Sequence, residues 1–339
     1  MILKELQISP YLLQLESLIR RVPPNHPSFE NIRDMLIREQ AGYYGEAQLV
    51  FPISKLDFQH DDLHNLRLQY NGHYFQLDFL LLTPRFLLII EAKNYRDQVI
   101  FDDEFNQVLH KDKVYQDPVV QVEEQKYQLE MWLQTKGFPH IPVETVVAMT
   151  NSQTLLKTSS ENSIYKEKVV TLPKLTSKIR EISSRYPKPC ISVSEMKWLG
   201  SQFIKEHKDY VSDIFLRTRI NKSELASGVV CPNCGEIGMK IRNLRWDCSN
   251  CGFRSSDAYR TALKDFYLLI GNEITNCEFR KFTGISSSST AKAMLRRSNF
   301  PKLGTRRYTK YKLSFNYAVD FDYLKNRNIY RSRKHIYRN

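Results

Sequence analysis

Three residues in the first half of the chain could together hydrolyse a phosphodiester bond. Asp78 ends an apolar stretch, and Glu91 and Lys93 follow the next apolar run. Residues two apart in a strand project from the same face, so Glu91 and Lys93 would share one surface. A turn at residues 83–85 would pair segment 74–82 with that strand and bring Asp78 to the same end of the sheet. Two carboxylates and an amine at one place suit metal-assisted hydrolysis.

Each of the three residues has a defined task in that chemistry. A hard cation such as Mg²⁺ (or Mn²⁺) is held by one or two carboxylates and keeps waters and phosphate oxygens, so Asp78 and Glu91 suffice as anchors. The metal would acidify a water and neutralise charge on the phosphate, while the Lys93 ammonium would hold that water or the phosphate. The simpler alternative is a strand-end carboxylate beside a surface ion pair, because a Glu-x-Lys tripeptide recurs by chance.

Four motifs follow one another between residues 30 and 185. They are Gly45-Glu46 after a predicted helix, Asp78 within a hydrophobic strand, Glu91-Ala92-Lys93-Asn94 at the end of the next strand, and Asp117-Pro118-Val119-Val120-Gln121 at the start of a helix to about residue 134. This order resembles the nuclease-related domain family, a branch of the PD-(D/E)xK restriction-endonuclease-like superfamily. Leu77 stands where the superfamily label has proline, so the "PD" is not literal here.

The resemblance implies a fold and a set of site residues. It implies an α/β, restriction-endonuclease-like core with a mixed central sheet, a metal site at Asp78 and Glu91, and a catalytic role for Lys93. By the same match, Glu46 becomes an accessory carboxylate on a helix and Gln121 a helix residue that faces the site. The nearby polar stretch at residues 60–64 contains two histidines and two aspartates, but its composition favours a solvated loop over a set of metal ligands.

Four of the six cysteines form a second motif. They occur as two Cys-x-x-Cys pairs separated by thirteen residues, namely Cys231, Cys234, Cys248 and Cys251. Paired Cys-x-x-Cys turns place four thiolates around one tetrahedral Zn²⁺, and a glycine after each pair suits a tight turn. A disulfide framework is the alternative, but it would leave the repeated spacing unexplained. The motif therefore predicts a structural zinc site in a fold that resembles a topoisomerase-type zinc ribbon.

The positive charge of the chain is concentrated near its C-terminus. Residues 296–339 contain thirteen Lys and Arg against two Asp, whereas the whole chain carries a net charge of +13. A basic segment interleaved with tyrosines is typical of a surface that binds the phosphate backbone of a nucleic acid. A solubilising basic tail is the alternative.

The sequence just before this segment predicts a helix-turn-helix. Thr275 and Glu278 can form a capping box, Gly284 a turn, and residues 286–289 the cap of a second helix that ends near Arg297. Residues 300–312 could then form a wing. Two short helices joined by a glycine turn also occur in folds that bind no DNA. The expected DNA contacts are Ser288, Lys292, Arg296, Arg297, Arg306, Arg307 and Lys310.

Length and composition set the expected organisation. A chain of 339 residues with 42% hydrophobic residues should form two or three units, and it has no apolar run long enough to cross a membrane. A cytoplasmic protein is expected. The expected parts are a helical segment (1–40), the nuclease-related domain (41–185), a helical connector (186–225), a Cys₄ zinc ribbon (226–255) and a basic, mainly helical module (256–339).

These inferences together predict a Mg²⁺-dependent DNA endonuclease whose ribbon and basic C-terminal module hold the substrate. One alternative is a DNA-binding or adaptor protein with a catalytically silent nuclease fold. The presence of Asp78, Glu91 and Lys93 argues against it, because a degenerate site would be expected to lack at least one of them. Another alternative is an RNA-binding or RNA-cleaving protein, because a contact to the ribose 2′-hydroxyl leaves no signature in the sequence.

Overall fold

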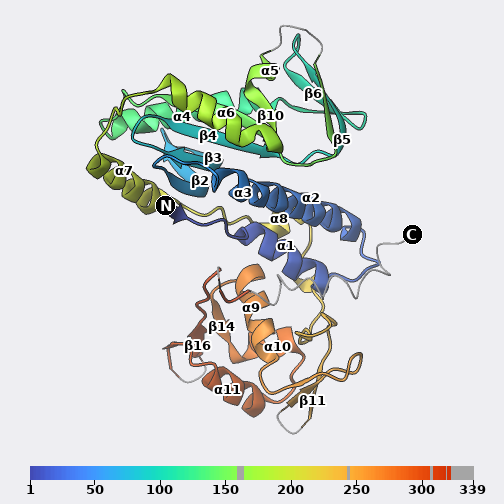
Figure 1. Cartoon of the computed structure of the whole chain (residues 1–339). Helices are drawn as coiled ribbons and strands as arrows, with labels where there is room; N and C mark the ends of the chain where they lie inside the picture. Colours follow the sequence, from blue (N-terminus) through green and yellow to red (C-terminus); the bar gives the residue numbers. More distant parts are fainter. Residues whose placement is uncertain (159–163, 243–244, 306–307, 318, 322–339) are drawn as a thin grey trace. The chain divides into compact units, whose positions relative to one another are not determined.

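The structure is a computed structural model that describes residues 1–158, 164–242, 245–305, 308–317 and 319–321 (Figure 1). The chain divides into two compact units. Unit 1 comprises Met1–Gln7 and Glu39–Asp209, and unit 2 comprises Ile8–Arg38 and Tyr210–Asn339. The expected connector is therefore shared, because its first half belongs to unit 1. No helix in the described ranges has the length and hydropathy that a membrane crossing needs.

A mixed six-stranded sheet, in the order β1-β2-β3-β4-β8-β10, forms the centre of unit 1. Its strands are β1 (Ile2–Lys4), β2 (Asp61–Tyr70), β3 (His73–Leu82), β4 (Leu87–Lys93), β8 (Val143–Met149) and β10 (Val169–Thr171). Strands β2, β3 and β4 are antiparallel neighbours, whereas β1 runs parallel to β2, and β4, β8 and β10 run parallel to one another. The predicted α/β fold with a mixed central sheet is confirmed.

Helices cover both faces of this sheet (Figure 1). Leu87 and Ile89 of β4 pack in the core beneath α4, and the residues that alternate with them pack beneath α6. The same alternation places Glu91 and Lys93 on the α4 face. The helices are α2 (Phe29–Gln48), α3 (Val50–Ile53), α4 (Pro118–Thr135), α5 (Tyr165–Lys168), α6 (Leu172–Arg185) and α7 (Val193–Glu206).

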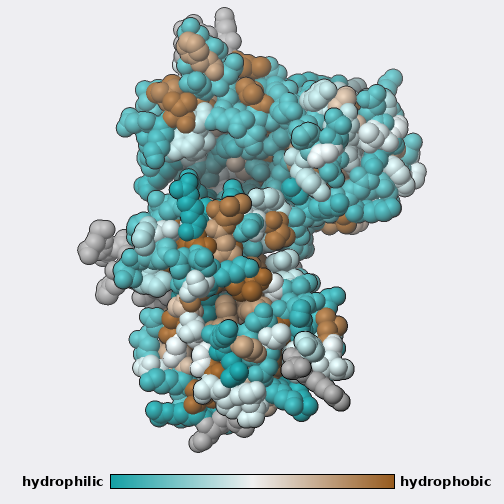
Figure 2. Space-filling view, turned by 180° about the vertical axis from the view of Figure 1, so that it is seen from behind, coloured by the Kyte–Doolittle hydropathy of each residue, from teal (hydrophilic) through white to brown (hydrophobic). Residues whose placement is uncertain are grey.

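A smaller sheet extends the central one. Its strand order is β7-β6-β5-β9, with β5 (Asp97–Asp102), β6 (Gln107–His110), β7 (Lys113–Gln116) and β9 (Thr154–Thr158). Strands β5 and β9 follow β4 and β8 directly in the chain and are parallel, like that pair. The view from behind shows hydrophobic residues grouped at the upper left, where this sheet lies, on an otherwise largely hydrophilic surface (Figure 2).

Unit 2 combines the cysteine-rich segment with helices. Its elements are α1 (Pro10–Arg21), α8 (Ile214–Thr218), a 3₁₀ turn (Lys222–Glu224), β11 (Lys240–Arg242), β12 (Arg245–Asp247), β13 (Arg254–Ser255), α9 (Tyr259–Leu269), β14 (Glu273–Thr275), α10 (Asn276–Thr283), α11 (Ser288–Arg297), β15 (Lys302–Leu303) and β16 (Lys310–Lys312). Strands β11, β12 and β13 form one antiparallel sheet, and β14, β16 and β15 form another. Residues of the ribbon and of helices α9 to α11 share one hydrophobic core.

Helix α1 is fixed in unit 2 by a buried ionic network. Asp265 of α9 accepts hydrogen bonds from Ser17 at 2.7 Å and from Arg20 and Arg21 at 2.9 Å each. Burial alone would raise the pKa of Asp265, but the two guanidinium groups and Ser17 lower it overall. A buried carboxylate is tolerated when it is paired and hydrogen-bonded in this way. The N-terminal helix thus belongs to the unit that is built mainly from the C-terminal part of the chain.

Candidate functional site

Lys93 lies at the centre of a hydrogen-bonded network on the α4 face of the sheet. Its Nζ donates to Glu91 Oε1 at 2.6 Å and to Gln121 Oε1 at 3.0 Å, and Gln121 Nε2 donates to the same Glu91 oxygen at 2.8 Å. Gln125 Nε2 donates to Glu91 Oε2 at 3.1 Å. The Glu91 side chain, only 3% exposed, is thus satisfied at both oxygens. The predicted pairing of Glu91 with Lys93 is internal rather than a surface ion pair.

Burial lowers the pKa of Lys93, but the nearby Glu91 and Asp78 raise it more, so the net shift is upward. The amine therefore stays protonated at neutral pH. An ammonium in this position can attract a phosphate or orient a water, but it is a poor general base.

Asp78 lies at the point where strands β3 and β4 separate. Phe79 and Ile90 are the last residues paired between these strands, and Asp78 and Glu91 occupy the next step. Asp78 Oδ2 accepts a hydrogen bond from the Ala92 backbone N–H at 2.9 Å. Burial raises the pKa of Asp78 well above its usual value, and the nearby carboxylates add to that rise, against the opposing effects of Lys93 and the Ala92 N–H.

A third carboxylate reaches the site from the last turn of helix α2. Asn65 Nδ2 donates to Glu46 Oε2 at 2.6 Å, and Gln76 Nε2 donates to Asn65 Oδ1 at 3.1 Å. Burial raises the pKa of Glu46 to about 7, with further upward contributions from Glu91 and Glu39 against the hydrogen bond from Asn65. Glu46 was expected to follow a helix, but it lies within one, because α2 continues to Gln48.

A close approach at Gly45 places this end of α2 beside the sheet. A Cβ atom at Gly45 would lie 2.9 Å from Asn94 Cβ and 3.0 Å from Thr150 Oγ1, both just beyond the ends of β4 and β8. Asn94 Nδ2 also donates to Ala41 O at 2.8 Å. Glycine at position 45 therefore lets the helix approach the strand ends closely, and Glu46 follows it in the sequence.

The donor set fits a hard divalent cation. Three carboxylates surround one ammonium, so the site has excess negative charge, and the raised pKa values of Asp78 and Glu46 express that repulsion. Within the described ranges, only the four cysteines place three or more metal-binding atoms within 4.8 Å of one another. The wider spacing of the carboxylates suits Mg²⁺, which takes one or two of them and keeps several waters.

All five predicted catalytic residues lie in or next to this network, namely Glu46, Asp78, Glu91, Lys93 and Gln121. Sequence reasoning missed Asn65, Gln76 and Gln125. Gln125 could have been found, because it lies one helical turn after Gln121. Asn65 could not, because its role depends on a left-handed backbone conformation within β2, with φ 49°.

The expected loop at residues 60–64 is wrong, because β2 begins at Asp61. His64 is buried and packs edge-on against Phe79, with ring centroids 4.7 Å apart. Burial lowers the pKa of His64 to about 4. A polar composition thus concealed a strand that is covered on both faces.

The four cysteine sulfurs form a compact group that suits zinc. The Sγ atoms of Cys231 and Cys251 are 3.7 Å apart, and those of Cys234 and Cys248 are 3.6 Å apart. Tetrahedral Zn–S bonds of about 2.3 Å would place sulfurs about 3.8 Å from one another. All four ligand atoms lie within 4.8 Å.

The two turns of the ribbon also support each other. Asn233 Nδ2 lies 3.5 Å from Cys251 Sγ, and Asn250 Nδ2 lies 3.6 Å from Cys234 Sγ, so each turn donates to a sulfur of the other. These donors lower the negative charge on thiolates and hold the ligands in place, as outer partners of metal ligands do.

Helices α10 and α11 present a basic concave surface. Thr275 and Glu278 form the predicted capping box, and Gly284 ends α10 with φ 74°. The hollow beside these helices has a volume of about 530 Å³. It is lined by the predicted contacts Ser288, Lys292 and Arg296, together with Arg280 and Lys302.

The remaining predicted contacts lie elsewhere. Arg297 pairs with Asp257 at 3.3 Å, and Lys310 pairs with Glu273 at 2.9 Å. Arg306 and Arg307 lie outside the described residues. The basic segment is also not simply a tail, because Leu313 and Phe321 are buried.

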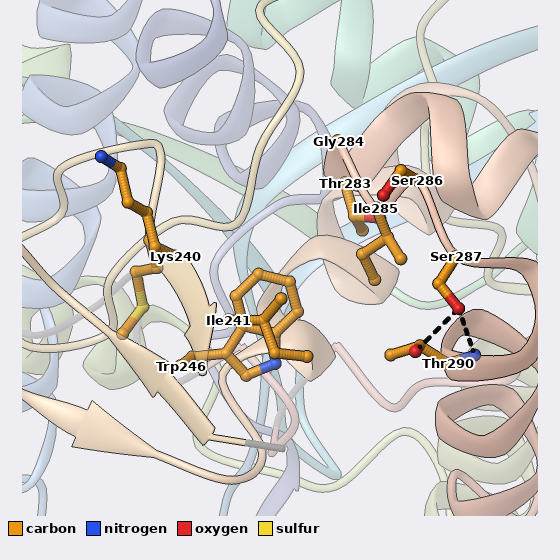
Figure 3. Close-up of a pocket in the computed structure, with 10 residues that line it drawn as sticks. Lys240, Ile241, Trp246, Thr283, Gly284, Ile285, Ser286, Ser287 and Thr290 are labelled. Atoms are coloured by element: carbon orange, nitrogen blue, oxygen red, sulfur yellow. Dashed lines mark hydrogen bonds between the residues drawn. The ribbon is translucent and has the colours of Figure 1, made fainter. Parts of the chain in front are cut away.

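A second hollow, of about 540 Å³, lies on the other side of the start of α11 (Figure 3). Ile241 and Trp246 of the ribbon form one wall, and the turn from Thr283 to Ser287 forms the other. Figure 3 shows Ser287, the N-cap of α11, bonded to Thr290 at this edge. The ribbon and the helical pair thus adjoin within one unit.

Comparison with known proteins gives one match. Residues 41–150 match the family model of the nuclease-related domain (NERD). The matched range contains all five residues of the carboxylate and lysine site and none of the ribbon or of helices α9 to α11. No curated protein and no solved structure matches the chain. The matched range thus carries a nuclease-related domain, in agreement with the resemblance seen in the sequence, and it indicates an interaction with nucleic acid.

Proposed function

We propose that the protein is a metal-dependent nuclease that hydrolyses phosphodiester bonds in DNA. The observation that carries this proposal is the network of Asp78, Glu91 and Lys93 at adjacent strand ends, inside the range that matches the nuclease-related domain. A catalytically silent domain would have no need to hold three carboxylates and an ammonium together, because their burial is costly.

Asp78 and Glu91 would hold Mg²⁺ or Mn²⁺. When bound, the cation supplies an acidified water and neutralises charge on the phosphate. Lys93 is charged at neutral pH, so it would attract the phosphate and position the attacking water. Gln121 bonds to both Glu91 and Lys93 and therefore keeps the ammonium in its place.

Glu46 is suited to proton transfer. A carboxyl group with a pKa of about 7 is present in both protonation states at neutral pH, which is the condition for an efficient general base. Asn65 holds one of its oxygens. We therefore assign Glu46 the role of accepting the proton of the attacking water.

Unit 2 would bind the substrate. The order α9-β14-α10-α11-β15-β16 is that of a winged helix-turn-helix, in which the second helix of the motif enters the major groove. Ser288, Lys292 and Arg296 of α11 share one concave surface, which supports duplex DNA as the partner. The ion pairs of Arg297 and Lys310 are half-exposed and therefore weak, so both residues could exchange their partners for phosphates.

The Cys₄ site would hold zinc in a structural role. Four thiolates close the coordination shell and leave no open position for a substrate or a water. Cys231 and Cys248 lie in the core of unit 2, so the metal would fix the ribbon against helices α9 to α11.

A cleavage assay tests the function. Supercoiled DNA, linear duplex DNA, single-stranded DNA and RNA are each incubated with the full chain, with Mg²⁺ or with chelator. Cleavage of DNA that requires the metal is the expected result. Cleavage of RNA alone would overturn the DNA assignment, and binding of DNA without cleavage of any polymer would favour an adaptor.

A further inference from the structure

Three aromatic rings form a cluster close to Lys93. The ring centroids of Tyr95 and His110 are 5.0 Å apart, those of Tyr95 and Tyr115 are 5.7 Å apart, and those of His110 and Tyr115 are 6.0 Å apart. The rings come from three segments, namely the residues after β4, the end of β6, and β7. The core of unit 1 does not enclose them, since Tyr115 is 38% exposed and the other two rings are partly exposed.

The segments that carry these rings run directly into the site. Tyr95 follows Lys93 by two residues. Tyr115 is two residues before Asp117, which caps helix α4 by accepting a hydrogen bond from Val119 N at 2.7 Å. The first turn of that helix carries Gln121, a partner of Lys93. Tyr95 is also close enough to interact electrostatically with Lys93, which opposes the rise that burial causes in the Tyr95 pKa.

The cluster adjoins positive charge as well. Lys111 and Lys113 lie on the hairpin that joins β6 to β7, and both are exposed. Lys111 pairs with the exposed Asp97 at 3.3 Å, an interaction that solvent weakens. Exposed rings beside surface lysines and an ammonium are the combination with which proteins bind single strands, because every base has a face that can stack and every nucleotide has a phosphate.

We propose that Tyr95, His110 and Tyr115 form a stacking platform for an unpaired base next to the bond that is cut. This inference rests on the proposed nuclease function and defines its substrate further. A base within a duplex has both faces covered by its neighbours. The strand at the site must therefore be single, frayed or locally opened, even when unit 2 holds a duplex.

The test measures stacking without cleavage. The full chain carries Asp78→Asn to stop hydrolysis, and the probe is a short single-stranded DNA that contains the fluorescent base 2-aminopurine. Stacking on an aromatic ring should quench the probe. Tyr115→Ala should weaken the binding that produces the quench by about 5- to 150-fold. Tyr115→Phe should keep it, because stacking needs the ring and not the hydroxyl.

Two controls separate stacking from other effects. Tyr127 is an exposed tyrosine of α4, 55% exposed, and Tyr127→Ala should leave the quench unchanged. An oligonucleotide with an abasic position should bind the protein with native Tyr115 more weakly than the intact one, by a similar factor. That comparison needs no substitution in the platform, so it decides the question even if Tyr115→Ala does not fold.

The outcomes also distinguish this inference from the proposed function. An equal quench in Tyr115→Ala and Tyr115→Phe, or equal binding of the abasic and intact strands, would show that the rings serve only as packing. Metal-dependent cleavage by the wild-type chain would then stand unaffected. Absence of cleavage in the wild-type chain would overturn the proposed function, whereas the quench would still report on the platform.

Discussion

Replacing Gly45 by alanine tests how closely helix α2 approaches the strand ends. The added methyl would lie 2.9 Å from Asn94 Cβ and 3.0 Å from Thr150 Oγ1, so the helix or the strand ends must move. Gly42 lies one turn earlier in the same helix, and a Cβ there would meet nothing within 4 Å. Gly42→Ala is therefore a matched control with the same chemical change and no clash.

The magnitude follows from the difference between the two positions. Alanine is favoured over glycine inside a helix by about 1 kcal/mol, and both variants receive that gain. Overpacking at Gly45 costs about 1 to 3 kcal/mol. Gly42→Ala should thus stabilise unit 1, and Gly45→Ala should be less stable than Gly42→Ala by about 1 to 3 kcal/mol.

Thermal unfolding and cleavage kinetics measure the two consequences. In a unit of this size, 1 kcal/mol shifts Tm by about 2 to 4 °C, so the two variants should differ by about 2 to 12 °C. Cleavage should fall in Gly45→Ala alone, because the displaced helix carries Glu46 with it. Equal Tm values for the two variants would refute the close docking of α2.

Three further predictions concern pH, zinc and the C-terminal segment. Because the folded state raises the pKa of Glu46 to about 7 from an ordinary 4.5, its ionisation opposes folding as pH rises through that window. The Tm of Glu46→Gln relative to wild type should therefore increase from pH 5 to pH 8, and a constant difference would contradict the shift. Cys248→Ser should remove one zinc per chain by elemental analysis and lower the Tm of all of unit 2, since the ribbon shares its core with α9 to α11; the exposed Cys277→Ser is the control and should keep the metal. A chain ending at Phe321 lacks six Lys and Arg and one Asp. Its log-log salt slope for duplex binding should flatten by about 0.9 for each phosphate that the shortened chain no longer binds, and an unchanged slope would show that the segment binds none.

Local patterns predicted the parts of the site that depend on neighbouring residues. Apolar runs located the ends of β3 and β4, and alternation placed Glu91 and Lys93 on one face. The cap at Asp117 and the spacing of the cysteines are also local, and both are seen in the structure. Such features depend on backbone geometry over a few residues, which the sequence states directly.

Features that depend on distant partners could not be predicted in this way. Helix α1 has the periodicity of an ordinary amphipathic helix, but its partner Asp265 lies more than two hundred residues later. Strand β1 is three residues long and is defined only by its pairing with β2. The pKa of Glu46 depends on burial against Glu91 and Glu39, and composition contains no measure of that burial.

The most direct test of the proposed active centre is the single-turnover rate of DNA cleavage at saturating DNA and Mg²⁺. Wild type is compared with Asp78→Asn and Lys93→Ala, and filter binding confirms that each variant still holds DNA. The rate should fall at least about a hundredfold in each variant, because each substitution removes a group that stabilises the transition state, while DNA affinity changes little. A Lys93→Ala protein that folds, binds DNA and cleaves it at the wild-type rate would contradict the assignment of this site.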